Sequence, residues 1–197
     1  MIAIVDYGAG NLASVVKALR AAGAEPRVVT DPSGLSDADG IVIPGVGHFD
    51  ATRGLDASWR SAIRAHIDRG VPLLGICLGV QWLYAGSDEA PGLEGLGIFE
   101  GRAFRLTGDV KVPHVGWNTI APVAESPLLT GVAAGAAVYF THSYAAPAGA
   151  GTIATTEHGQ TFAAIVERGN VAGMQFHPEK SGAAGLTLLR NWVSRAL

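Results

Sequence analysis

The sequence predicts an α/β fold: an open, largely parallel sheet flanked by helices, with an antiparallel extension. Residues 1–85 alternate strand-like and helix-like segments, which favours parallel strands joined by helices. The second half carries shorter strand-like segments and a turn at 168–170, which favour antiparallel pairing. No repeat or low-complexity linker divides the 197 residues, so we expect a single domain over 1–197.

Apolar patterning places the individual elements. The expected strands of the first half are 1–5, 26–30, 40–43 and 71–76. Helical spacing predicts helices over 12–22, 57–69 and 183–196, the first capped by Asn11 and ended by Gly23. The strand-like segments of the second half are GRAFRL, AAVYFTHSY, GTIATTEH, TFAAIVERG and NVAGMQF.

Composition excludes several classes of protein. The net charge is −3 and no basic patch stands out, so a nucleic-acid partner is not expected. The single cysteine excludes an internal disulfide framework and suits a reducing compartment. The N-terminus has no basic region before its apolar run, and the apolar segment 71–86 is shorter than the ~20 residues of a membrane helix. We therefore expect a cytoplasmic protein without a membrane partner.

The only cysteine, Cys77, lies at the junction of a predicted strand and a predicted helix, in the stretch GICLGVQ. Such a sharp turn lifts its central side chain above the sheet, and Gly75 and Gly79 remove side chains that would clash. The start of a helix favours an anion and therefore a thiolate. These features predict a nucleophile, whereas most free cysteines are small buried hydrophobes. A nearby base would decide between the two.

Among the six histidines, His177 is the candidate base. His66 lies between charged residues of a predicted helix, where we expect it to be solvated, and His158 lies in a turn-like segment. His177 ends a predicted strand in MQFHPEKSG, and Glu179 projects to the same side of an extended chain. A carboxylate beside an imidazole fixes its tautomer and raises its basicity. The alternative is a surface His–Glu pair.

Taken together, GICLGVQ and QFHPEKS resemble the two site motifs of the class I, triad-type glutamine amidotransferases, 100 residues apart. The resemblance implies a flavodoxin-like fold. The blocks DYGAGNLASV, PGVGHF, KVPHVGWN and YFTHSY are similar to those of the branch that serves as the glutaminase subunit of imidazole glycerol phosphate synthase, in histidine biosynthesis. PGVG and PHVGWN distinguish this branch. Val80 departs from its more common methionine, which we expect to affect packing only.

The resemblance also implies roles for residues. Cys77 would attack the glutamine carboxamide, and His177, oriented by Glu179, would transfer protons. The N–H groups of Leu78 and Val46 would stabilise the oxyanion, the latter after a peptide flip. The implied substrate contacts are Gly47, Gln81, Ser143 and Tyr144. Each of these roles has an alternative: an ordinary turn for PGVG, a position on the helix surface for Gln81, and packing in the core for Tyr139 and Tyr144.

A glutaminase of this class needs a partner, because free ammonia in neutral water is mostly ammonium. The resemblance implies a heterodimer with a (β/α)8-barrel cyclase. The sequence contains no visible metal-ligand cluster, and the expected chemistry requires no cofactor. Trp117 is the expected anchor of the interface, since tryptophan is enriched at hot spots. Its alternative is packing over its own domain. Residues beside the site motifs complete the expected interface: Asn11, Tyr139 and Lys180.

Three competing interpretations stay open. The first is another class I amidotransferase subunit, such as that of anthranilate or pyridoxal-phosphate synthase. The second is a catalytically dead scaffold, against which the intact Cys77, His177 and Glu179 argue. The third is a general thiol hydrolase on the same fold, which leaves the PGVG and PHVGWN blocks unexplained.

Overall fold

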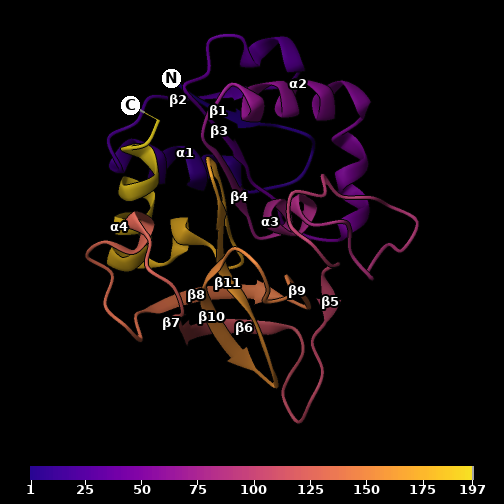
Figure 1. The fold of residues 1–197 in the computed structure, drawn as a ribbon, viewed down its shortest axis with the longest axis vertical. Helices are drawn as coiled ribbons and strands as arrows, with labels where there is room; N and C mark the ends of the chain where they lie inside the picture. Colours follow the sequence, from indigo (N-terminus) through magenta and orange to yellow (C-terminus); the bar gives the residue numbers. More distant parts are fainter. Residues whose placement is uncertain (197) are drawn as a thin grey trace.

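An eight-stranded sheet forms the centre of the computed structural model, which describes residues 1–196 (Figure 1). Its strand order is β2-β1-β3-β4-β12-β11-β10-β7. The five parallel strands are β1 (Ile2–Val5), β2 (Pro26–Val29), β3 (Gly40–Ile43), β4 (Leu73–Ile76) and β12 (Val171–Met174). The antiparallel strands are β11 (Gln160–Arg168), β10 (Thr152–His158) and β7 (Ala121–Pro122). The predicted α/β class, with its antiparallel extension, is confirmed.

Two small antiparallel pairs lie beside the main sheet. One joins β5 (Phe104–Arg105) to β9 (Tyr144–Ala145), and the other joins β6 (His114–Thr119) to β8 (Ala137–His142). The pairing of β6 with β8 brings the PHVGWN and YFTHSY segments together, with His114 opposite His142.

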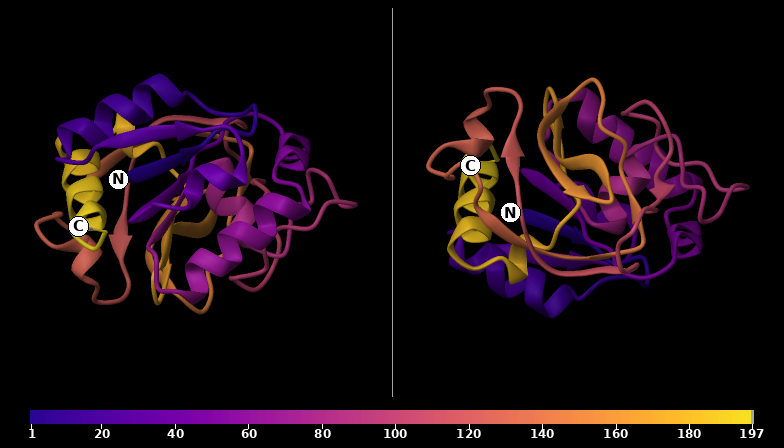
Figure 2. Two further views of the ribbon diagram at one scale, coloured as in Figure 1. Left: turned by 90° about the horizontal axis from the view of Figure 1, so that it is seen from above. Right: turned by 90° about the horizontal axis from the view of Figure 1, so that it is seen from below.

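Helices cover both faces of the sheet (Figure 2). One apolar core contains Leu19 of α1 (Leu12–Ala21) and Trp192 of α4 (Gly182–Val193). A second core contains Trp59 of α2 (Ala57–Asp68) and Trp82 of α3 (Leu78–Leu83). Short 3-10 helices complete the chain: η1 (Pro32–Leu35), η2 (Phe49–Gly54), η3 (Pro127–Leu129) and η4 (Pro178–Lys180).

The predicted elements of the first half are present, with shifts at their ends. Asn11 caps α1 by accepting the Ser14 N–H through its side chain, and a turn at Gly169 separates β11 from β12. The last helix ends at Val193 instead of 196, because the Arg195 N–H donates to the Trp192 carbonyl and tightens the final turn.

The prediction of a solvated His66 was wrong. Its side chain is 6% exposed, and its ring nitrogens lie 2.7 Å from the Ala62 carbonyl and 2.8 Å from the Leu35 carbonyl. The spacing of His66 from Trp59 and Ile63 places all three on the inner face of α2. The charged neighbours occupy the other face.

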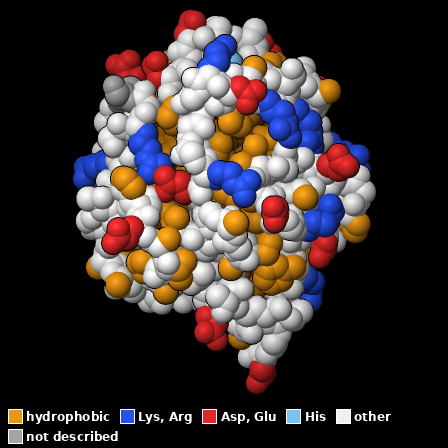
Figure 3. Space-filling model, in the orientation of Figure 1, with side chains coloured by type: hydrophobic (Ala, Val, Ile, Leu, Met, Phe, Trp, Pro, Cys, Tyr) orange, Lys and Arg blue, Asp and Glu red, His pale blue; other side chains and the backbone are white. Residues whose placement is uncertain are grey.

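Acidic and basic side chains are interspersed on the face of the molecule in Figure 3, in line with the small net charge of −3. Within residues 1–196, no helix combines the length and apolar character needed to cross a membrane.

The register of β4 against β12 brings the two predicted site motifs together. Gly75 pairs with Gly173 and Ile76 with Met174, both strands running in the same direction. The Cys77 N–H continues the ladder by donating to the Met174 carbonyl at 2.8 Å. The residues that follow the two strands therefore leave the same edge of the sheet, although 100 positions separate Cys77 from His177.

The glycines on either side of Cys77 allow α3 to approach the sheet closely. A Cβ on Gly75 would lie 2.7 Å from the Gly79 carbonyl carbon. A Cβ on Gly79 would overlap the Ile43 carbonyl oxygen at the end of β3. The helix can start directly above the strand only because neither position has a side chain.

We predict that Gly79→Ala lowers the free energy of unfolding by at least ~2 kcal/mol, since the new methyl group meets backbone that cannot move independently. Urea unfolding followed by circular dichroism measures the change. Gly92→Ala is the matched control, because its Cβ meets no atom within 4 Å. Equal midpoints for the two variants would contradict the close approach.

Candidate active site

Cys77 lies at a strained corner between β4 and α3. Its φ of 51° makes it the one residue other than glycine with a positive φ in the described chain. Such a conformation disfavours side chains and persists where the surrounding structure enforces it, often at functional sites. The side chain is 4% exposed, and its Sγ lies 3.9 Å from the Thr141 carbonyl oxygen. The thiol is thus held at a fixed position above the sheet edge.

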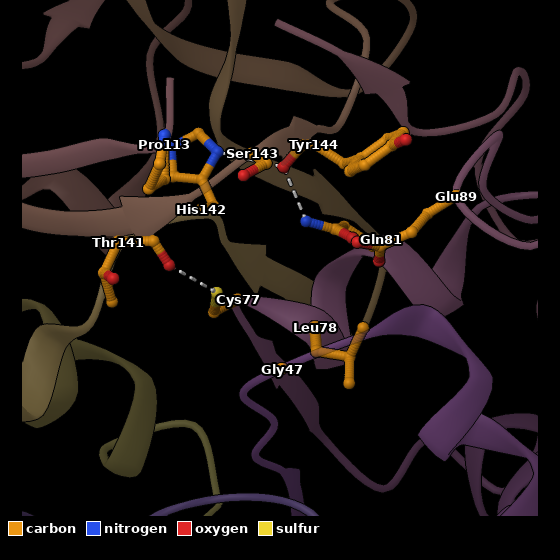
Figure 4. A pocket seen from close by; sticks show the side chains of 10 residues that line it. All are labelled: Gly47, Cys77, Leu78, Gln81, Glu89, Pro113, Thr141, His142, Ser143 and Tyr144. Carbon is orange, nitrogen blue, oxygen red and sulfur yellow. Dashed lines mark hydrogen bonds between the residues drawn. The ribbon is translucent and has the colours of Figure 1, made fainter. Parts of the chain in front are cut away.

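A cavity of about 260 Å³ opens beside this thiol (Figure 4). Its lining combines the turn at Cys77, the PGVG loop and the YFTHSY segment. The lining residues are Gly47, Cys77, Leu78, Gln81, Glu89, Pro113, Thr141, His142, Ser143 and Tyr144. All four predicted substrate contacts, Gly47, Gln81, Ser143 and Tyr144, lie in this lining.

His177 and Glu179 form a buried pair behind the thiol. His177 Nδ1 lies 2.7 Å from Glu179 Oε1, and both side chains are 2% exposed. Burial favours the neutral ring, but the Cys77 sulfur and the Glu179 carboxylate outweigh it and raise the pKa of His177 to about 10. His177 Nε2 makes no hydrogen bond within residues 1–196, which leaves it available to the thiol and to a substrate. The surface-pair alternative is therefore wrong.

Backbone contacts hold this pair in place. The His177 N–H donates to the Tyr139 carbonyl of β8 at 2.9 Å. The Ser181 hydroxyl donates to the His177 carbonyl at 2.6 Å and accepts the Tyr139 N–H at 2.9 Å. Strand β8 and Ser181, at the end of η4, thus fix the backbone of His177 from two sides.

The two predicted oxyanion donors, Leu78 and Val46, keep their backbone N–H groups free in the described part of the chain. Within residues 1–196, no hydrogen bond uses the N–H of Leu78 or of Val46. Leu78 is the first residue of α3 and lines the cavity, whereas Val46 is 37% exposed in the neighbouring loop and lies outside the lining. The loop packs tightly against the helix, since a Cβ on Gly45 would lie 2.6 Å from the Leu78 Cβ.

The structure adds polar residues to the site that the sequence did not single out. Glu89 lines the cavity and accepts the Phe49 N–H at 2.7 Å. Gln175 is fully buried, and its Nε2 lies 3.9 Å from Cys77 Sγ. The Ala146 N–H donates to Gln175 Oε1 at 2.9 Å, which turns the amide nitrogen toward the sulfur. Gln175 adjoins the His177 motif in sequence, whereas nothing local marks Glu89.

The expected interface residues lie around the site. Trp117 on β6 is 59% exposed, and its ring centroid is 6.1 Å from that of Tyr139. Lys180 Nζ lies 5.9 Å from the Tyr139 ring centroid. Asn11 is exposed at the start of α1, which packs against η4. Trp117 therefore packs edge-on against Tyr139 of its own domain and still leaves most of its surface exposed, so its role as the interface anchor stays a prediction.

The chain matches the family model described as glutamine amidotransferase class-I over residues 3–196. Imidazole glycerol phosphate synthase subunit HisH of Halobacterium salinarum is 49% identical, with 98% of this chain and 92% of the relative covered. The same subunit of Methanothermobacter thermautotrophicus is 46% identical, with 98% of each chain covered.

Solved structures agree at the level of the fold. A glutamine amidotransferase structure aligns with a TM-score of 0.78 at 19% identity, covering 100% of this chain and 99% of that one. PurLQS from Thermotoga maritima also aligns with a TM-score of 0.78 at 19% identity, covering 98% and 97%. On the evidence of the family model and the closely similar relatives, this chain belongs to the class I glutamine amidotransferases, and within them to the HisH subunits of imidazole glycerol phosphate synthase.

Proposed function

We propose that this chain hydrolyses glutamine to glutamate and ammonia as the glutaminase subunit of an imidazole glycerol phosphate synthase, using Cys77, His177 and Glu179. The observation that carries this proposal is the placement of a strained, buried thiol beside a buried His–Glu pair at the edge of a polar cavity. One family model spans residues 3–196, which supports a single amidotransferase domain over 1–197.

The geometry supports a thioester mechanism. The Cys77 thiolate attacks the side-chain carboxamide carbon of glutamine. The N–H group of Leu78 and, after a peptide flip, that of Val46 donate to the oxyanion, each contributing ~3 kcal/mol. The His177 imidazolium gives its proton to the departing nitrogen, so ammonia leaves and a glutamyl thioester forms. His177 then takes a proton from water, which attacks the thioester and releases glutamate and the thiol.

Substrate binding follows from the cavity lining. We assign Gly47, Gln81, Ser143 and Tyr144 to the contacts with glutamine, because they surround the space next to Cys77 Sγ (Figure 4). The chemistry uses no cofactor or metal. The unpaired thiol suits the cytoplasm, where such groups stay reduced.

The ammonia must reach an acceptor without becoming ammonium, so we propose a heterodimer with the cyclase subunit. Trp117 supplies an exposed aromatic anchor, next to Tyr139 and Lys180. The Tyr139 carbonyl accepts the His177 N–H. This bond connects the proposed docking surface directly to the catalytic histidine. Asn11, at the exposed start of the neighbouring helix, completes the surface.

Cys77→Ala tests the function most directly. In the purified complex with the cyclase, we expect loss of glutamine-dependent synthesis of imidazole glycerol phosphate, because the nucleophile is gone. Synthesis from an ammonium salt at high pH should persist, since the acceptor site is intact. Coupled assays with each nitrogen source measure both rates. Loss of both activities in a complex that still assembles would mean that Cys77 is structural.

Glu179→Gln should reduce glutaminase activity by roughly 10²-fold or more, because the ring loses its orienting anion. The wild-type pKa of His177 is raised to about 10, so the imidazolium persists to mildly alkaline pH. Without the carboxylate this pKa falls, and the ring deprotonates at a lower pH. NMR titration of His177 checks the direction. Glu125→Gln, at an exposed carboxylate, is the control. An unchanged titration midpoint would refute the assigned role.

Trp117→Ala should weaken binding of the cyclase by ~30-fold or more, the loss expected for a hot-spot tryptophan. Unfolding should be unaffected, because the ring is 59% exposed. Titration calorimetry gives the affinity. Val123→Ala removes a comparably exposed apolar group, at 57%, outside the proposed surface and should bind normally. Equal affinities for the wild type and both variants would place the interface elsewhere.

A further inference from the structure

A chain of hydrogen bonds runs behind the cavity from β6 to its lining. Asn118 Nδ2 lies 3.2 Å from His114 Nε2, and His114 Nδ1 lies 3.2 Å from His142 Nε2. His142 Nδ1 lies 2.9 Å from the Tyr144 carbonyl oxygen. His114 and His142 are buried, and the mechanism above uses neither of them.

Backbone groups fix the direction of this chain at both ends. The Thr119 N–H donates to Asn118 Oδ1 at 2.8 Å, so the amide must turn its Nδ2 toward His114. The Glu157 carbonyl accepts from the same nitrogen at 3.0 Å, which agrees with that orientation. At the other end, the Tyr144 carbonyl can only accept, so His142 Nδ1 must carry the proton.

Both ends therefore require the same tautomer. Asn118 donates to His114 Nε2, His114 donates from Nδ1 to His142 Nε2, and His142 donates from Nδ1 to Tyr144. Each ring is neutral with its proton on Nδ1. Burial, reinforced by the neighbouring histidine, lowers the pKa of His142 to about 3. Burial also lowers that of His114 to about 4, reinforced by His158.

The Tyr144 carbonyl links this chain to the substrate pocket. It also accepts Gln81 Nε2 at 2.7 Å, as the dashed line in Figure 4 shows. A second contact of the same nitrogen, 3.5 Å from Gln175 Oε1, agrees with this orientation of the Gln81 amide. The Tyr144 carbonyl thus accepts two hydrogen bonds, one from His142 and one from Gln81 of α3.

We propose that His142 is a positioning residue of the glutamine pocket: its Nδ1–H holds the Tyr144 carbonyl, which orients Gln81, while Asn118 and His114 hold His142 in the required tautomer. This inference rests on the proposed glutaminase function. It assigns to His142 an effect on substrate binding through Tyr144 and Gln81, and no proton transfer in the reaction.

Two substitutions separate this role from simple packing. His142→Leu removes the donor, and we expect KM for glutamine to rise about 3- to 10-fold while kcat changes less than about 2-fold. His142→Asn places an amide N–H near the position of Nδ1, so KM should stay within about 2-fold of the wild type. Both substitutions lose the ring contacts with Phe140 and Phe162. Packing alone would therefore impair both variants.

Glutamate release by the purified complex with the cyclase supplies these constants. His158→Gln is the matched control. His158 stacks on His114 with ring centroids 4.0 Å apart, but it donates to the Lys111 carbonyl and takes no part in the hydrogen-bond series that reaches Tyr144. Its KM should be unchanged. An unchanged KM in His142→Leu, or equal increases in the Leu and Asn variants, would overturn the proposal. An inactive wild-type complex would instead refute the glutaminase function itself.

A measurement on the wild type keeps the inference testable if His142→Leu fails to fold. Ring ¹⁵N chemical shifts report which nitrogen of a neutral histidine carries the proton. We expect Nδ1–H for both His114 and His142 in the complex at neutral pH. An Nε2–H tautomer of His142, or a charged ring, would overturn the proposal, because Tyr144 could not then be held as described.

Discussion

The parallel pairing of β4 with β12 is the constraint on which the site depends. Its register places the carboxyl ends of the two strands side by side, and each strand is followed by one half of the proposed catalytic apparatus. A shift of one residue would turn every side chain of β12 to the other face of the sheet. The separation of Cys77 and His177 along the chain is therefore irrelevant to their proximity. What matters is that both follow buried strands with the same direction.

Close packing around β4 then sets the conformation of Cys77. Helix α3 starts so near to β3 that Gly79 cannot carry a side chain, and the turn before it forces a positive φ on the cysteine. Strain of this kind costs of order 1–3 kcal/mol and must be offset by the surrounding structure. Here the buried strands on either side of β4 supply that support. The thiol is consequently rigid before any substrate arrives, which favours attack from one geometry.

The sequence was informative where function depends on local order. Periodicity located the strands of the first half, and the paired motifs singled out Cys77, His177 and Glu179, which follow neighbouring strands at one edge of the sheet. It was uninformative where roles depend on tertiary pairing. His114 and His142 meet only because β6 pairs with β8, and Glu89 reaches the cavity from a loop with no local marker. His66 was misjudged because its charged neighbours concealed its place on the inner face of α2.

The proposed site contains two histidine environments, which suit the two proposed roles: proton transfer for His177 and positioning of neighbouring groups for His142. His177 is buried but faces a carboxylate and a sulfur, so its pKa is raised and it can hold a proton for transfer. His142 is buried among a second histidine, aromatic rings and a backbone carbonyl, so its pKa is lowered, and the charge of His177 adds to that effect. Environment separates the two pKa values in opposite directions, as it does for paired acids and bases in other enzymes. A ring that stays neutral has a fixed donor and a fixed acceptor, which is the property required of a group that holds others in place.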